Sequence, residues 1–196
     1  MEEILAVTIG YVVGSVPFAF LMAQRRGVDL RRVGSGNVGA ANVLRTSGAL
    51  IAMAAMCLDV AKGAVVVMVV QRLFSAPATP VAAGLAAVIG HAYPVWLGFH
   101  GGKGVATAAG AFMTLVPVAV AIAAAVFVLV TWVTRYVSVG SMSAAATLVA
   151  AAAASNVSPA VTVGTAVVGV IIVLRHRGNL GRLLAGTEHK VGERLQ

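Results

Sequence analysis

Residues 49–70 read ALIAMAAMCLDVAKGAVVVMVV, an apolar run that is long enough to cross a lipid bilayer as one helix. Its charged residues are Asp59 and Lys62, which are three positions apart and therefore share a face of a helix. Charges at this depth in a membrane are costly and normally pair with each other. The run predicts a transmembrane helix with an internal ion pair, and we favour a structural pair over a proton relay.

The composition of the whole chain extends this interpretation. The protein has 196 residues, of which 60% are hydrophobic and 10% are charged, and its mean hydropathy is +0.97. A soluble domain carries about 25% charged residues, so this chain is predicted to be an all-α, polytopic integral membrane protein. Alanine, valine and glycine dominate the apolar runs and favour a tight helix bundle.

The apolar segments predict seven transmembrane helices, some of them short. The stretch 105–133 is too long for one ordinary span, and we divide it at Pro117, because proline removes a backbone hydrogen bond and clashes with the preceding turn. Five spans result if the later segments merge or re-enter the membrane. The predicted helices cover residues 4–23, 49–70, 81–99, 105–116, 117–133, 141–154 and 159–174.

Basic residues predict the orientation of the chain. The net charge is +8, and the arginines and lysines gather in the links 24–48 and 101–104 and in the tail from Arg175. Such links face the cytoplasm, and an even number of spans between Lys103 and the tail agrees with the division at Pro117. Anionic lipid and phosphorylated substrates are therefore the expected partners, rather than nucleic acid. No linker marks a second domain, so residues 1–196 are predicted to form one.

The first polar loop, GSGNVGAANVLR at 34–45, combines glycines with hydrogen-bonding side chains and an arginine. Glycines let backbone N–H groups approach an anion, and the planar fork of Arg45 fits a phosphate. The four arginines before this loop, at 25, 26, 31 and 32, are interpreted as topology signals instead. The candidate site residues of the loop are Ser35, Gly36, Asn37, Gly39, Asn42 and Arg45.

The second polar loop contains GGKG at 101–104 and runs directly into a predicted helix. A helix N-terminus offers free N–H groups and partial positive charge to an anion, and Lys103 adds a full charge. The loop is not a Walker A motif, because Leu97 and Gly104 stand where glycine and a hydroxyl residue are required. His91 is either a proton carrier or a structural residue. The candidates here are His91, Gly101, Gly102, Lys103, Gly104 and Thr107.

The third polar segment begins at Arg175 and places His176 and Asn179 three residues apart, on one face of a helix. These two side chains can hold the hydroxyls of a small polyol while a neighbouring arginine such as Arg182 holds phosphate. The alternative is a basic anchor at a helix end. Ser141 and Ser143, at the start of another predicted helix, cap that helix or reach an anion.

Together these blocks resemble the bacterial acyl-phosphate:glycerol-3-phosphate acyltransferase family. The matching segments are SGNVGAAN at 35–42, DVAKG at 59–63, GHAYP at 90–94 and GGKGVAT at 101–107, followed by Arg175, His176, Asn179, Arg182, Gly186, Glu188 and Lys190. Ala41 and His100 depart from the residues that the family often has, which are Thr and Lys. The resemblance spans the whole chain.

The resemblance implies an enzyme that transfers a fatty acyl group from acyl phosphate to the 1-hydroxyl of sn-glycerol 3-phosphate, giving lysophosphatidic acid and phosphate. It implies a multi-pass protein of the bacterial cytoplasmic (inner) membrane whose active site faces the cytoplasm, without a cofactor, a metal or a required oligomer. The expected catalytic residues are Ser35, Arg45, Lys103, His176 and Asn179, and Glu188 joins the other candidates as a substrate-binding residue.

The residues favour catalysis by positioning and charge stabilisation, because no Asp follows any histidine at the spacing of soluble acyltransferases. A substrate phosphate oxygen is the expected proton acceptor, with His176 as the other candidate base. Two other functions remain. A transporter of phosphorylated metabolites or anions needs a polar route through the bilayer, and the only charged residues inside a predicted span are Asp59 and Lys62. A lipid-binding scaffold explains the basic loops but not their glycines and asparagines.

Overall fold

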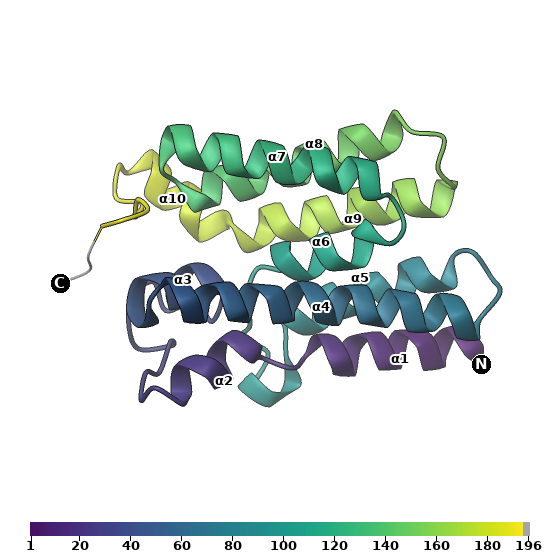
Figure 1. Ribbon diagram of the computed structural model, residues 1–196, viewed down its shortest axis with the longest axis horizontal. Coiled ribbons are helices and arrows are strands. Elements are labelled where there is room, and N and C mark those ends of the chain that lie inside the picture. Colours follow the sequence, from purple (N-terminus) through teal and green to yellow (C-terminus); the bar gives the residue numbers. More distant parts are fainter. Residues whose placement is uncertain (194–196) are drawn as a thin grey trace.

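The computed structural model describes residues 1–193, and every regular element within them is helical (Figure 1). Apolar runs without interior breaks form the long helices, and proline or glycine residues begin or end most of them. The helices are α1 (Glu2–Gly14), α2 (Phe18–Gln24), α3 (Ala40–Ser47), α4 (Ala49–Leu73), α5 (Thr79–Ala92), the 3₁₀ turn η1 (Val95–Leu97), α6 (Val105–Met113), α7 (Pro117–Thr134), α8 (Val137–Ala153), α9 (Pro159–Arg175) and α10 (Arg177–Leu184).

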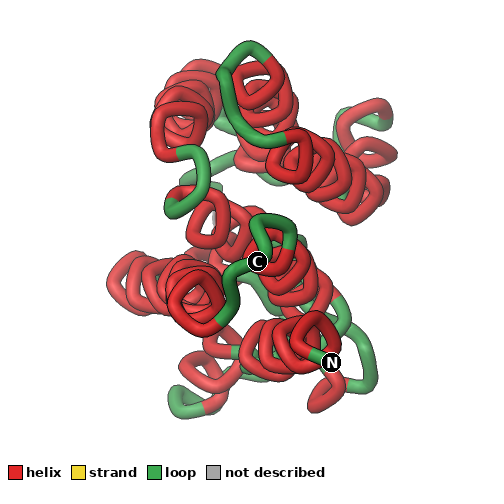
Figure 2. Tube along the Cα trace, turned by 90° about the vertical axis from the view of Figure 1, so that its right-hand side faces the viewer, coloured by secondary structure: helices red, strands yellow, loops and turns green. Residues whose placement is uncertain are grey.

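The helices form two layers, with α6 between them (Figures 1 and 2). One layer holds α1, α4 and α5, and the other holds α7, α8 and α9. Short α6 packs against α4 and α5 on one side and against α7 and α9 on the other. Its Phe112 is fully buried in a core shared with Val67, Val81 and Val168. This central helix follows directly on Lys103, so the packing of the core places that lysine.

Glycines let the helices of the first layer approach closely. A Cβ atom at Gly10 or Gly14 of α1 would overlap the backbone of α5, and one at Gly110 of α6 would overlap the carbonyl of Val60 on α4. In a membrane, lipid tails are as apolar as the helix surfaces, so tight van der Waals packing of small residues supplies the association energy. The helix contacts therefore depend on the absence of side chains at these positions.

Gly110→Leu should separate α6 from α4 and lower the thermal unfolding midpoint of the purified protein, because overpacking of this kind costs about 1–3 kcal/mol. Thermal unfolding in detergent or nanodiscs measures the effect. Gly181→Ala, on α10, is the matched control, since its new Cβ would meet no atom within 4 Å. A Gly110→Leu protein with the wild-type midpoint would contradict the close approach of α4 and α6.

Candidate membrane spans agree with the all-helical prediction. Within residues 1–193, four stretches are long and apolar enough to cross a bilayer, namely Glu2–Gln24, Ala49–Leu73, Thr79–Leu97 and Pro117–Thr134. The pair α9 and α10, bent by 52°, gives a fifth if it acts as one span. Each of the seven predicted apolar segments contains an α-helix, although α6 has nine residues and α8 has 17, and the predicted boundary at Pro117 is confirmed. The predicted helix 81–99 is wrong beyond Ala92, where α5 ends before Pro94 and the short turn η1 follows.

Three local features differ from the predicted segments. The first span is not one straight helix, because it breaks at Ser15, Val16 and Pro17, where proline supplies no N–H group. The link 24–48 contains the eight-residue helix α3. The tail continues after a bend at His176 as α10. Figure 1 shows α3, α10 and the described carboxyl end gathered at one end of the bundle, opposite the amino terminus.

Candidate active site

Glu188 joins the third polar segment to the rest of the site. Its Oε1 accepts hydrogen bonds from Ser138 Oγ at 2.8 Å and from Asn179 Nδ2 at 2.5 Å, and its Oε2 accepts one from Arg182 Nε at 2.7 Å. Burial by itself would raise the pKa of Glu188, but these three hydrogen bonds outweigh it and hold the pKa below its ordinary value. Glu188 is therefore a buried carboxylate anion at the junction of α8, α10 and the tail.

Lys103 carries the second polar loop into the same cluster. Its Nζ donates to Asn179 Oδ1 at 2.5 Å, so the amide of Asn179 lies between Lys103 and Glu188. The pKa of Lys103 is lowered to about 8, mainly by burial; the positive charges of Arg182, Arg45 and Arg175 act in the same direction, and Glu188 opposes them. The loop lysine therefore sits among more positive than negative charge, as a site for a phosphate requires.

Arg45 brings the first polar loop to the cluster. Its Nη2 donates to the backbone carbonyl of His189 at 3.4 Å, across 144 residues of sequence. Burial lowers the pKa of Arg45, while the charge of nearby Glu188 opposes that shift. The three polar segments singled out in the sequence thus converge, with Arg45, Lys103 and Arg182 around Glu188.

Other candidates of the first loop shape the loop itself. Asn42 is buried, and its side chain accepts from Ser35 N at 2.9 Å and donates to the carbonyls of Leu30 and Val33, each at 3.1 Å. Asn37 Oδ1 accepts from Gly39 N at 3.0 Å. Gly36 has a φ of +70°, which glycine adopts without strain. Ser35 is half-buried, and no hydrogen bond among the described residues uses its hydroxyl, so this group remains available to a substrate.

The glycine loop is held on both sides of its backbone. Gly101 N donates to the carbonyl of Ala92 and Gly102 N donates to that of His91, both at 3.1 Å. Arg175 donates to the carbonyls of Gly101 and Gly102 at 2.9 and 3.1 Å. Gly104, with a φ of +83°, then turns the chain into α6. Since the amides of Gly101 and Gly102 are occupied, an anion here is left with Lys103 and the free N–H groups that begin α6.

His176 lies buried at the bend between α9 and α10. Its Nδ1 is 2.8 Å from the carbonyl oxygen of Ile172. A carbonyl can only accept, so Nδ1 carries the proton of the neutral ring, and Nε2 is the nitrogen with a free lone pair. This tautomer leaves His176 able to accept a proton or a hydroxyl hydrogen bond at Nε2.

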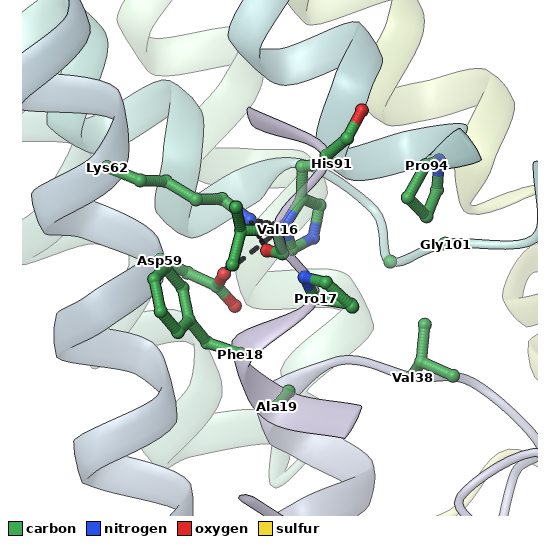
Figure 3. Close-up of a pocket in the computed structure, with 12 residues that line it drawn as sticks. Val16, Pro17, Phe18, Ala19, Val38, Asp59, Lys62, His91, Pro94 and Gly101 are labelled. Atoms are coloured by element: carbon green, nitrogen blue, oxygen red, sulfur yellow. Dashed lines mark hydrogen bonds and ion pairs between the residues drawn. The ribbon is translucent and has the colours of Figure 1, made fainter. Parts of the chain in front are cut away.

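Four further candidates lie within helices. Thr107 is fully buried, and its carbonyl faces Gly63 of α4. Ser141 is buried and donates to the carbonyl of Val137, one turn earlier in α8, at 2.8 Å. Ser143 is half-buried on the same helix. His91 belongs to another cluster with Asp59 and Lys62, as Figure 3 shows. The structure brings none of these four into hydrogen-bond contact with the Glu188 cluster.

Three residues that hold the site together were not among the site residues predicted from the sequence, although Arg175 was named in the third polar segment. Ser138 stands one helical turn before Ser141 and is the hydroxyl that reaches Glu188. Arg175 clamps the glycine loop and stacks on the Tyr93 ring at 4.8 Å. Arg135, with a left-handed φ of +64°, exchanges two hydrogen bonds with Val191 of the tail. The adjacency of Arg175 to His176 was a usable signal, whereas nothing in the sequence pairs Arg135 with Val191.

Known proteins are similar to this chain in sequence. The family model "Glycerol-3-phosphate acyltransferase" matches residues 4–186. The glycerol-3-phosphate acyltransferase of Geobacter sulfurreducens is 43% identical over 190 residues, covering 97% of this chain and 98% of its own. That of Myxococcus xanthus is 46% identical over 186 residues, covering 94% and 97%.

A solved structure agrees over nearly the full length. The crystal structure of PlsY, an integral membrane glycerol 3-phosphate acyltransferase in its glycerol 3-phosphate form, matches with a TM-score of 0.94 and 37% identity, over 98% of this chain and 96% of that one. PlsY has also been solved in a lysophosphatidic acid form. The chain belongs to the glycerol-3-phosphate acyltransferase family and is an integral membrane enzyme of lipid synthesis.

The depressed pKa of Lys103 predicts how substrate binding varies with pH. Its pKa of about 8 means that the ammonium charge is present at pH 7 and is lost as the pH rises through 8. A phosphate monoester is already close to a dianion at pH 7, since its second pKa is about 6. The KM for glycerol 3-phosphate should therefore rise by about 10-fold between pH 7 and pH 9, because a charge-assisted contact of about 1.5 kcal/mol is lost.

Steady-state kinetics across this range measure the effect. Lys103→Arg keeps its charge at pH 9 and should show a flatter pH dependence than the wild type, even if its KM at pH 7 is higher. A wild-type KM that stays constant from pH 7 to pH 9 would contradict the role given to Lys103.

Proposed function

We propose that the protein transfers the acyl group of an acyl phosphate to the 1-hydroxyl of sn-glycerol 3-phosphate, releasing lysophosphatidic acid and inorganic phosphate. The observation that carries the proposal is the convergence of Arg45, Lys103 and Arg182 around the buried carboxylate of Glu188. Such a cluster needs a dianion to complete its charge balance, and both substrates carry phosphate. Family membership supports glycerol 3-phosphate as the acceptor.

The reaction needs positioning more than a protein nucleophile. The 1-hydroxyl oxygen attacks the acyl carbonyl carbon and forms the ester bond, while the bond from that carbon to the phosphate oxygen breaks. Inorganic phosphate leaves with the electron pair, and its oxygen accepts the hydroxyl proton. Lys103 and Arg45 stabilise the phosphate charge, and Asn179 fixes Lys103 through its Oδ1. His176 Nε2 is the alternative proton acceptor.

An apolar groove beside the α1–α2 break supports a long-chain donor. It has a volume of about 560 Å³, and its lining is almost wholly apolar. Val16 and Pro17 line both this groove and a small cavity that reaches Gly101 and Gly102, so the groove lies next to the glycine loop. We assign the acyl chain to this groove. Its lining residues are Val12, Val13, Val16, Pro17, Phe20, Leu21, Trp96 and Leu97.

The donor is tested with purified protein, acyl phosphate and labelled glycerol 3-phosphate. Labelled lysophosphatidic acid should form without ATP, and excess chelator should leave the rate unchanged, because the proposed mechanism uses substrate phosphate and protein cations. Acyl-CoA and acyl carrier protein loaded with the same chain are the control donors and should give little product. Strict dependence on magnesium, or equal rates with acyl-CoA, would contradict the proposal.

The same assay tests the cations. Arg45→Ala and Lys103→Ala should each lose about 10- to 150-fold in kcat/KM, since a charge-assisted contact contributes about 1.5–3 kcal/mol. Arg26→Ala removes an exposed arginine of the 24–48 link and should keep nearly the wild-type rate. Near-wild-type turnover of Lys103→Ala would place the substrate phosphate at another loop.

We also propose that the site faces the cytoplasm, with the amino terminus outside, as in a bacterial inner-membrane protein. The excess of basic residues in the links that carry the site supports this orientation. After Cys57 is replaced by Ala, single cysteines at Ser35 and Gly186 should react slowly with an impermeant maleimide in intact cells and rapidly after permeabilisation. Pro77→Cys, at an exposed position in the link predicted to lie outside, is the control. Rapid labelling of position 35 in intact cells would contradict this orientation.

A further inference from the structure

A buried ion cluster lies under the glycine loop, apart from the Glu188 cluster. Asp59 and Lys62 of α4 are 2% and 4% exposed, and the ring of His91, near the end of α5, faces them (Figure 3). Lys62 Nζ is 2.8 Å from Asp59 Oδ1, which confirms the ion pair predicted from their spacing. None of the three residues of this cluster takes part in the chemistry of the proposed acyl transfer.

The ammonium group of Lys62 makes one ion pair and two hydrogen bonds. Besides Asp59, Nζ contacts the carbonyl of Val16 at 2.9 Å and His91 Nδ1 at 3.0 Å. Since an ammonium can only donate, Nδ1 of His91 accepts, and the ring proton is on Nε2. Asp59 Oδ1 is 3.5 Å from the same ring nitrogen and is not hydrogen-bonded to it, so Lys62 makes the polar contact to the ring. The cluster therefore determines the position of the imidazole and its tautomer.

The ring of His91 in turn supports the glycine loop from below. A Cβ atom built on Gly102 would overlap His91 Nε2, so the loop backbone rests against the ring. The carbonyl of His91 also accepts the N–H of Gly102, while Arg175 holds the loop carbonyls from the other side. Lys103 is the next residue along. The distance between this loop and the end of α5 therefore determines the position of Lys103 and of the first turn of α6.

The contact with Val16 extends this support to the first helix pair. Val16 lies at the break between α1 and α2, where its carbonyl also accepts the N–H of Phe18 at 3.1 Å. Since Pro17 interrupts the helix, the backbone groups at the break need other partners inside the membrane. Lys62 provides one, and it thereby connects the wall of the apolar groove to the loop that carries Lys103.

The cluster has no room for a substrate. The cavity beside it measures about 10 Å³, which is the space of one water and far less than a phosphate group needs. A buried ion pair is also weak evidence for stability, because desolvation cancels much of its Coulomb energy. A role in geometry remains, since the cluster binds the carbonyl of Val16, which lines the apolar groove, and the ring of His91, which lies against the glycine loop.

We propose that Asp59, Lys62 and His91 are positioning residues of the acyl transfer. They hold the Gly101–Gly102 backbone in the position, relative to α5, that places Lys103 against the phosphate of glycerol 3-phosphate. The inference depends on the proposed role of Lys103 but not on the identity of the acyl donor. The loss should appear in KM for glycerol 3-phosphate rather than in kcat, because a displaced Lys103 weakens phosphate binding before it alters the reacting bond.

A double-mutant cycle on Gly102 and His91 tests the contact between loop and ring. Gly102→Ala should raise the KM for glycerol 3-phosphate by about 30-fold in the wild type, since the new methyl group forces the loop off the ring. In the His91→Ala background the same change should cost no more than about 3-fold, because the opposing ring is gone. Equal costs in the two backgrounds would overturn the proposal. Neither variant leaves a buried charge without its ion partner.

Conservative and neutral variants separate positioning from folding. His91→Asn keeps an acceptor near Nδ1 and should stay within about 3-fold of the wild-type KM, whereas His91→Ala should raise it by about 10-fold. The neutral pair Asp59→Asn with Lys62→Met should raise KM by about 10-fold while kcat and the thermal midpoint change little. Arg26→Ala is the control.

Two results would overturn the positioning role. One is a wild-type KM for glycerol 3-phosphate in the folded double variant Asp59→Asn with Lys62→Met. The other is a loss in His91→Ala that falls entirely on kcat. Activity measured after replacing Lys103 by Ala separates this proposal from the proposed function. If Lys103→Ala keeps the wild-type KM, Lys103 does not bind the substrate phosphate, and both proposals are contradicted. If Lys103→Ala raises the KM and the variants of the cluster do not, only the positioning role is contradicted.

Discussion

The carboxylate of Glu188 is the contact on which the arrangement of the site depends. Two helices and the tail meet there, because Ser138, Asn179 and Arg182 all donate to its two oxygens. Without that negative charge, Arg182, Lys103 and Arg45 would repel one another in a partly dehydrated space. The tail is held in place by a second contact, the pair of hydrogen bonds between Arg135 and Val191.

The same charges make the site receptive to a phosphate. One carboxylate does not balance the neighbouring cations, and burial with this excess lowers the pKa of Lys103 to about 8. A bound phosphate dianion removes the imbalance, so its binding favours the charged form of the lysine. In the proposed mechanism the protein supplies a preorganised positive cluster, and the substrate supplies both the missing charge and an oxygen that accepts the proton.

Two requirements act on this chain: its helices must pack closely in the membrane, and its site needs an irregular loop whose backbone polar groups all have partners. The helices associate through glycines such as Gly10 and Gly110, whose backbones touch their neighbours. A loop that binds phosphate needs irregular backbone, which hydrocarbon does not tolerate unless its polar groups find partners. The glycine loop meets both demands: its amides bind the carbonyls at the end of α5, and its carbonyls bind Arg175.

The amino-acid sequence by itself determined the class of protein and predicted part of the candidate site. Apolar run length and the scarcity of charge require membrane helices, Pro117 marks a helix boundary, and the spacing of Asp59 and Lys62 predicts their ion pair. These are local properties that depend on composition and on helical periodicity. The polar motifs predicted that Arg45, Lys103 and Asn179 belong to one site, and the family resemblance added Glu188 to that prediction.

Only the tertiary structure decided which of these residues touch one another. Asn42 and Asn37 stabilise their own loop, and His91 supports the glycine loop from the Asp59–Lys62 pair. Glu188 accepts hydrogen bonds from three protein side chains. A motif states which hydrogen-bonding groups are present, but their partners depend on helix crossings and on bends at Pro17 and His176. Contacts across 144 residues, such as Arg45 with His189, have no local signal because packing alone brings their ends together.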